Sequence, residues 1–234
     1  MDAVRRRFGE TAGALAALQD ARHEETVERV ARLLGLSGSE RVLDVGCGAG
    51  AIALAVAGTA REVVGVDVVP ELLAEARARA ASNVSFVEAD ATALPFARGE
   101  FDVVCCARVF HHVPRPELVL AEMTRVLRAG GTMLVVDQLA PDDPLAAIEL
   151  NRFEHARDPS TSRVLADVDL RGLFDANGLV LHAVEYVREE RELELYLDRA
   201  ACHGAAREEA RALAPGDPSG RYGWYVLHKP SFGG

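Results

Sequence analysis

Lysine is almost absent from this 234-residue chain: Lys229 is the one lysine among 26 basic residues, and the net charge is −10. Proteins that bind the phosphate backbone concentrate basic side chains, so this balance argues against nucleic-acid binding. The chain also lacks any apolar run of about 18 residues or more, so we expect no membrane span. The arginine cluster near the N-terminus precedes no continuous apolar stretch, which argues against a signal peptide.

Cysteine is scarce as well. The chain has four cysteines, and none of them forms a Cys-x-x-Cys pair: Cys47, Cys105, Cys106 and Cys202. The two adjacent ones fall in an expected strand, where neighbouring side chains point to opposite faces and do not suit a disulfide. A reducing, cytoplasmic location therefore fits best. Their spacing from the histidines does not match a zinc site, so we predict no metal.

Apolar, β-branched runs alternate with helical stretches through the middle of the chain. The runs are hydrophobic on both sides, as buried parallel strands are, and cover residues 41–45, 63–67, 84–90, 101–107 and 132–137. Helices are expected between them, notably at 70–80, which opens with proline, and at 116–131, which ends in Gly-Gly. This order predicts an α/β fold with a mainly parallel sheet and helices on both faces.

The two flanking regions differ from this repeat. Residues 1–40 are expected to form an N-terminal helical lid, and residues 138–165, with three prolines, are expected to form a cap over the substrate side. A helix, a strand, a helical segment and a last strand are then expected at 168–178, 179–187, 191–213 and 222–230. With no repeat or linker in the sequence, one domain over residues 1–234 is the simplest account.

A glycine-rich turn after the first expected strand indicates a cofactor site. Gly46-x-Gly48-x-x-Ala51 fits the dinucleotide-binding pattern, and Asp67 follows Gly46 by 21 residues, where an acid could hold a ribose. Asp44 disfavours this reading, because a strand that leads into a pyrophosphate-binding turn is usually apolar, whereas a carboxylate there could meet an ammonium group. Each acid has a structural alternative, since Asp44 or Asp90 could simply cap a following helix or turn.

Four segments in order resemble the class I S-adenosylmethionine (SAM)-dependent methyltransferases. They are VLDVGCGAG, VVGVDVVPELLAEA, VEADATALPFARGEFDVVCCARVFHHV and EMTRVLRAGGTMLVVD, and the likeness extends from about Val4 to Pro230. The small-molecule branch that includes ubiquinone/menaquinone-biosynthesis enzymes is the most similar. The resemblance implies a Rossmann-like fold of seven strands with the last one antiparallel, and SAM as the cofactor.

The resemblance also implies a role for individual residues. Gly46, Cys47 and Gly48 would pack against the methionine part of SAM, and Asp67 would accept hydrogen bonds from both ribose hydroxyls. The remaining contacts would be Val68 beside the adenine, Asp90 at the adenine amino group, the Ala91 N–H at a ring nitrogen, and Ala107 with Arg108 at the sulfonium and amino-acid end. One departure is the absence of a tyrosine in the lid, a role that Phe8 could cover in part.

The substrate side is expected to hold any catalytic base. His112 lies after the fourth strand at the cofactor mouth, and His155 lies in the cap beside Arg157. His112 could instead serve helix capping or packing, and His155 could instead form an ion pair at the surface. The apolar cap residues Leu145, Ile148, Leu150 and Phe153 would either face a hydrophobic substrate or form the core face of one helix.

The resemblance predicts methyl transfer to a small-molecule acceptor at a carbon, oxygen or nitrogen atom. A SAM-binding protein without transferase activity and an NAD(P)-dependent oxidoreductase are the alternatives. Many relatives of this kind are dimers, so a homodimer stays open.

Overall fold

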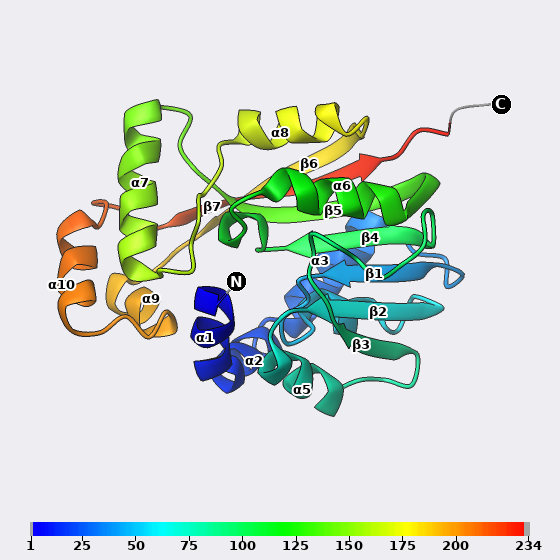
Figure 1. The fold of residues 1–234 in the computed structure, drawn as a ribbon, viewed down its shortest axis with the longest axis horizontal. Coiled ribbons are helices and arrows are strands. Elements are labelled where there is room, and N and C mark those ends of the chain that lie inside the picture. The colour runs from blue at the N-terminus through cyan, green and yellow to red at the C-terminus, as the bar shows by residue number, and fades with distance from the viewer. Residues whose placement is uncertain (1, 232–234) are drawn as a thin grey trace.

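A twisted sheet of seven strands forms the centre of the computed structural model, which describes residues 2–231 (Figure 1). The strand order is β3-β2-β1-β4-β5-β7-β6. The strands are β1 (Arg41–Val45), β2 (Glu62–Asp67), β3 (Val84–Glu88), β4 (Phe101–Ala107), β5 (Leu127–Leu139), β6 (Val180–Glu189) and β7 (Gly220–His228). The first five strands pair in parallel, and β7 lies antiparallel between β5 and β6. The expected Rossmann-like architecture with an antiparallel last strand is confirmed.

Helices cover both faces of this sheet. They are α1 (Asp2–Glu10), α2 (Ala12–Asp20), α3 (His23–Leu34), α4 (Ala51–Val56), α5 (Pro70–Ala78), η1 (Phe110–His112), α6 (Pro116–Val126), α7 (Pro144–Arg157), α8 (Asp167–Ala176), α9 (Leu193–Arg199) and α10 (Gly204–Leu213). Helices α3, α4 and α5 pack with one face of the sheet in one core cluster, and α6 and α8 pack with the other face. Parallel strands with apolar residues on both sides require such a double cover.

Two boundaries differ from the sequence expectation. The helix expected at 116–131 ends at Val126, and β5 begins at Leu127 rather than at residue 132. Leu127 is fully buried and pairs with Phe101 of β4, so tertiary pairing extends the strand through the Gly-Gly pair. The helical segment expected at 191–213 is two helices, because the chain turns at Ala201 and Gly204, which both have positive φ.

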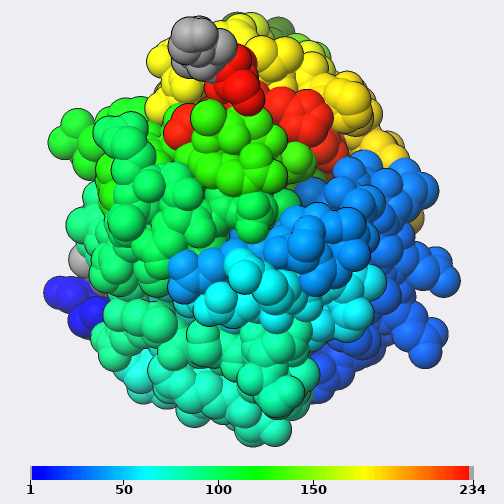
Figure 2. Space-filling view, turned by 90° about the vertical axis from the view of Figure 1, so that its right-hand side faces the viewer, coloured from blue at the N-terminus to red at the C-terminus, as the bar shows by residue number. Residues whose placement is uncertain are grey.

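The helices outside the alternating strand–helix repeat gather at one end of the sheet. Helices α7, α9 and α10 lie together there, and the N-terminal helices α1 and α2 lie beside them (Figure 1). The opposite end has no such cover, and Figure 2 shows blue and cyan segments of the N-terminal half there next to green segments of the central chain. Within residues 2–231 no helix combines the length and apolar character that crossing a membrane would require.

Candidate active site

A cavity of about 820 Å³ lies where the parallel strands end. Its wall includes the residues that follow β1, β2, β3 and β4, together with helices α1, α2 and α9. In sheets of this type the order reverses between two central strands, here β1 and β4, and ligands bind where the following loops diverge. The volume falls within the range of roughly 300–1,000 Å³ that small-molecule sites occupy.

The glycine loop forms the floor of this cavity. Gly46 and Gly48 both have positive φ, a conformation that favours glycine. A Cβ on Gly46 would lie 2.3 Å from Cγ2 of Val109, so the loops after β1 and β4 touch at this point. A Cβ on Gly48 would make ordinary van der Waals contacts with Gln19 (3.6 Å) and Leu72 (3.9 Å), and Gly48 itself lines the cavity.

Two buried carboxylates face the cavity beside this loop. Asp44 is 1% exposed, and its Oδ2 accepts a hydrogen bond of 2.9 Å from the backbone N–H of Ala53 in the first turn of α4. Asp67 accepts from the backbone N–H groups of Gly48 (2.8 Å) and Val69 (3.0 Å). Asp44 therefore caps the helix, as its structural alternative anticipated, and it also lines the cavity.

Neither carboxylate has an ion-pair partner within the described part of the chain. Burial raises the pKa of Asp44 to about 7, and the nearby charge of Asp67 adds to the effect. Burial also raises the pKa of Asp67, although its backbone hydrogen bonds act in the opposite direction. Buried carboxylates without a counterion are costly, so a ligand that brings donors or a positive charge would relieve both.

An unpaired acceptor lies near the same loop. Gln19 of α2 lines the cavity, and its Oε1 is buried with no hydrogen-bond partner among residues 2–231. Its Nε2 lies 3.6 Å from the position that a Cβ on Gly48 would occupy. Buried acceptors are normally satisfied, so this oxygen also fits a ligand with hydrogen-bond donors.

The other residues expected to bind a cofactor also line the cavity. They are Cys47, Val68, Asp90, Ala91, Ala107 and Arg108. Asp90 Oδ1 accepts from the N–H and the hydroxyl of Thr92, so Asp90 also forms the turn that its structural alternative anticipated. Arg108 has a φ of 62° and directs its guanidinium to Glu189 and to the hydroxyl of Tyr222. All ten residues expected to bind a cofactor therefore surround one space.

His112 is held in a defined orientation at the opposite wall. Its Nδ1 lies 3.2 Å from the carbonyl oxygen and 3.1 Å from the hydroxyl oxygen of Ser160. That hydroxyl lies 2.6 Å from Asp158 Oδ1 and donates to it, so both Ser160 oxygens act as acceptors toward the ring. Nδ1 must then carry the proton, which leaves Nε2 as the basic nitrogen of the neutral imidazole.

Contacts from both sides fix this histidine. Phe8 of α1 packs edge-on against the His112 ring with centroids 5.0 Å apart, and Arg7 forms an ion pair of 3.1 Å with Asp158. Burial, and secondly the adjacent His111, lower the pKa of His112 to about 3. His111 itself contacts Asp137, which anchors η1 to β5. His112 is therefore neutral over the physiological pH range.

The structure does not bring His155 to this site. Its side chain is exposed on α7, its Nδ1 lies 3.0 Å from the carbonyl oxygen of Thr161, and it is not part of the cavity wall. The apolar cap residues do not line the cavity either: Leu145 and Ile148 are exposed, and Phe153 is buried against α9 and α10. The cap contributes Gln138, Arg157 and Asp158 instead.

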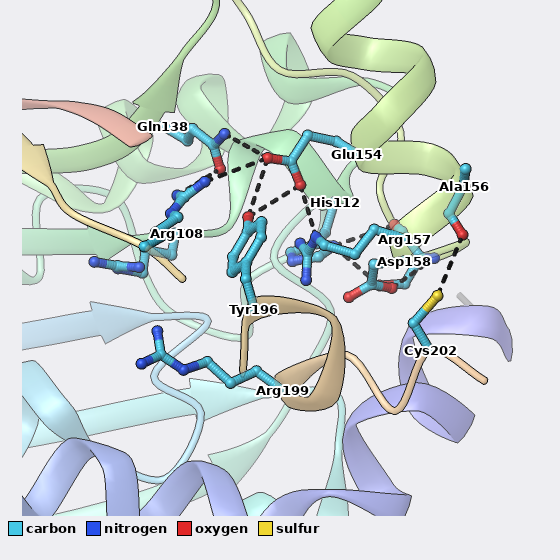
Figure 3. Close-up of polar contacts among 12 residues, drawn as sticks. Arg108, His112, Gln138, Glu154, Ala156, Arg157, Asp158, Tyr196, Arg199 and Cys202 are labelled. Atoms are coloured by element: carbon cyan, nitrogen blue, oxygen red, sulfur yellow. Dashed lines mark hydrogen bonds and ion pairs between the residues drawn. The ribbon is translucent and has the colours of Figure 1, made fainter. Parts of the chain in front are cut away.

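Sequence reasoning missed the wall formed by the C-terminal third of the chain. Tyr196 and Arg199 of α9, Glu189 of β6 and Tyr222 of β7 all line the cavity. Behind them the Glu154 carboxylate joins α7 to neighbouring elements (Figure 3). Glycine spacing reveals the cofactor side, but no local pattern connects residues so far apart in the sequence.

Comparisons with known proteins identify the family. A family described as a methyltransferase domain matches residues 43–135. The ubiquinone/menaquinone biosynthesis C-methyltransferase UbiE of Ectopseudomonas mendocina is 34% identical over 179 residues, which cover 73% of this chain and 70% of UbiE. The chain belongs to the class I SAM-dependent methyltransferases. This membership confirms the resemblance read from the sequence and removes the dinucleotide-binding alternative.

Two further relatives of this methyltransferase chain come from bacilli. YcgJ of Bacillus subtilis, named an uncharacterized methyltransferase, is 34% identical over 62% of this chain, and the match spans 59% of the length of YcgJ. The crystal structure of a candidate methyltransferase from Bacillus halodurans superimposes with a TM-score of 0.83 at 26% identity, covering 88% of this chain and 99% of that one.

The family match covers only part of the chain. Residues 43–135 contain the glycine loop, Asp67, Asp90 and the end of β4. Helices α7 and α9 and strands β6 and β7, which form the other wall, lie outside it. The family match therefore covers the glycine-loop wall of the cavity and not the wall formed by α7, α9, β6 and β7.

Proposed function

We propose that this protein, as one domain over residues 1–234, transfers the methyl group of SAM to a small molecule. The observation that carries the proposal is the pair of buried carboxylates, Asp44 and Asp67, which lack a counterion in the described residues and face the cavity beside the glycine loop. SAM supplies an activated methyl group on a sulfonium, together with a ribose diol and an ammonium group.

The cofactor side offers a complementary group for each part of that molecule. Asp67 would accept from the ribose hydroxyls, and Asp44, with the unpaired oxygen of Gln19, would face the ammonium. Gly46, Cys47 and Gly48 would border the methionine chain, with Ala107 and Arg108 at its far end. The adenine would lie beside Val68, Asp90 and Ala91. These assignments use the lining positions described above.

The acceptor would occupy the space between the glycine loop and α9. Transfer from a sulfonium requires alignment and exclusion of water more than acid–base chemistry, and residues of α1, α2 and α9, which line the cavity, would contribute to both. Where the acceptor atom arrives protonated, we propose that Nε2 of His112 takes the proton, because Ser160 holds its Nδ1–H. We assign no such role to His155.

A thermal-shift and transfer experiment tests this function. SAM and S-adenosylhomocysteine are expected to raise the melting temperature and NADH is not, since a ligand that binds only the folded state stabilises it. Radiolabelled SAM should then label small molecules in a cell extract rather than macromolecules. Stabilisation without any labelled product would support the SAM-binding alternative, and the absence of stabilisation by either ligand would refute the proposal.

A further inference from the structure

Charge is distributed unevenly along the cavity wall. Eight arginines and seven acidic residues line it, and three of those acids, Asp44, Asp67 and Asp90, are the ones proposed to hold SAM. Four acids remain to face eight arginines: Glu25, Asp158, Glu189 and Glu190. In a chain with a net charge of −10, this excess of positive charge is local to one part of the molecule.

Arg157, at the end of α7, is the most deeply placed of these arginines. It is 8% exposed, its Nε lies 2.9 Å from Glu154 Oε2, and its guanidinium stacks 4.0 Å from the centroid of the Tyr196 ring. Its two terminal nitrogens have no hydrogen-bond acceptor among residues 2–231, although the residue lines the cavity. A buried guanidinium with free donors is a ready site for an oxyanion.

The carboxylate beside Arg157 does not neutralise this region. Glu154 is 1% exposed and accepts hydrogen bonds from Gln138 (2.7 Å) and from the hydroxyl of Tyr196 (3.0 Å). Glu154 also lies beside a second guanidinium group, since Arg191 lies 3.5 Å from its Oε1. Its lone pairs are therefore largely used, and one negative charge serves two positive ones (Figure 3).

A second guanidinium extends toward the cavity from α9. Arg199 is drawn in Figure 3 with its side chain directed away from the Glu154 group, and it makes no ion pair or side-chain hydrogen bond with the described residues. Asp158 is already engaged by Arg7 and Ser160, and Glu189 by Arg108 and Arg22. Glu25 pairs with Arg29, and Glu190 pairs with Arg188. None of the four acids outside the proposed cofactor contacts is therefore left to pair with Arg199.

We propose that the methyl acceptor carries an oxyanion, a carboxylate or a phosphate, that binds the free donors of Arg157, with Arg199 at the entrance. The inference rests on the proposed function and names its substrate class. Six guanidinium groups meet three carboxylates at this end, since Arg22 shares Glu189 with Arg108: Arg7, Arg22, Arg108, Arg157, Arg191 and Arg199 against Glu154, Asp158 and Glu189. The carboxylate of SAM itself would account for one of the three unmatched charges, which leaves positive charge for the acceptor.

Calorimetry on protein saturated with S-adenosylhomocysteine tests the proposal with benzoate, phenyl phosphate and the uncharged benzamide as probes. At least one anion is expected to bind ten or more times as tightly as benzamide, and which anion does so separates carboxylate from phosphate recognition. Arg157→Gln should reduce this preference to less than threefold while leaving the affinity for S-adenosylhomocysteine within threefold. Arg163→Gln, which alters an exposed arginine outside the cavity, is the matched control and should keep the preference.

Arg199→Gln provides a second variant at an exposed position, where folding is not at risk, and should weaken anion binding about three- to tenfold. The proposal is overturned if benzamide binds as well as both anions, if no anion binds at millimolar concentration, or if both variants keep the preference. It is also overturned if Arg157→Gln mainly weakens S-adenosylhomocysteine, since Arg157 would then serve the cofactor. Failure of wild-type protein to bind S-adenosylhomocysteine would instead refute the proposed function.

Discussion

The carboxylate of Asp44 is predicted to destabilise the protein when no ligand is bound. It is buried, has no ion-pair partner in residues 2–231, and accepts one backbone hydrogen bond from Ala53. Asp44→Asn keeps an oxygen that can accept this bond and removes only the charge. The substitution should therefore stabilise the unliganded fold at neutral and alkaline pH, and it should weaken SAM binding because the ammonium group loses its counterion.

The magnitude follows from the difference in pKa between the folded and unfolded states. The pKa of Asp44 is about 7 in the folded protein and 3.8 in the unfolded chain. Because the folded value is the higher one, the favourable contribution is complete below the unfolded pKa and is lost as pH rises through the folded pKa. About three pKa units correspond to at most ~4 kcal/mol, and relaxation around the charge reduces this, so we expect about 2–4 kcal/mol at pH 8.

Urea unfolding of both proteins across the pH range measures this effect. The gain in unfolding free energy of Asp44→Asn over wild type should be small at and below about pH 4, rise between pH 4 and pH 7, and reach a plateau above pH 7 to 8. Asp142→Asn, at an exposed position, is the control and should show no such trend. A gain that does not change with pH, or a loss of stability at pH 8, would show that this carboxylate is not an uncompensated buried charge.

Three further substitutions test other parts of the site. Asp67→Ala should weaken SAM binding by about 10²–10⁴-fold, since two charge-assisted hydrogen bonds of roughly 1.5–3 kcal/mol each are lost, and calorimetry showing less than a threefold loss would contradict the assignment. Glu154→Gln should lower the unfolding free energy by about 3–5 kcal/mol, because two buried guanidinium groups lose their carboxylate, whereas Glu149→Gln on the exposed side of the same helix should change it by less than about 0.5 kcal/mol. His112 has a folded pKa of about 3, below the unfolded 6.5, so its stabilising contribution is present above pH 6.5 and is lost as pH falls. When the pH is lowered from 6.5 to 4.5, the unfolding free energy measured in urea should therefore fall less for His112→Gln than for wild type. An equal fall in both proteins would place this histidine in contact with solvent.

The cofactor side could be predicted from the sequence because its chemistry lies in short segments. A strand, a glycine turn and a helix within residues 41–56 specify the loop, and Asp67 and Asp90 each follow a strand whose end the sheet places at the same edge. The resemblance of these segments to a known family named the expected cofactor residues, and the pairing of parallel strands brings all ten to the wall of one cavity.

The acceptor side depended on tertiary structure. Glu154 of α7 is distant in sequence from Arg191 and Tyr196. Only the packing of α7 against α9 and α10 brings the three side chains together. The same packing buries Phe153 and leaves His155 outside the cavity, which helical periodicity did not distinguish. The sequence by itself determined the parallel sheet and its glycine loop, because these arise from local patterns. Tertiary structure decided which charges line the opposite wall of the cavity, because buried ion pairs depend on contacts between separate elements.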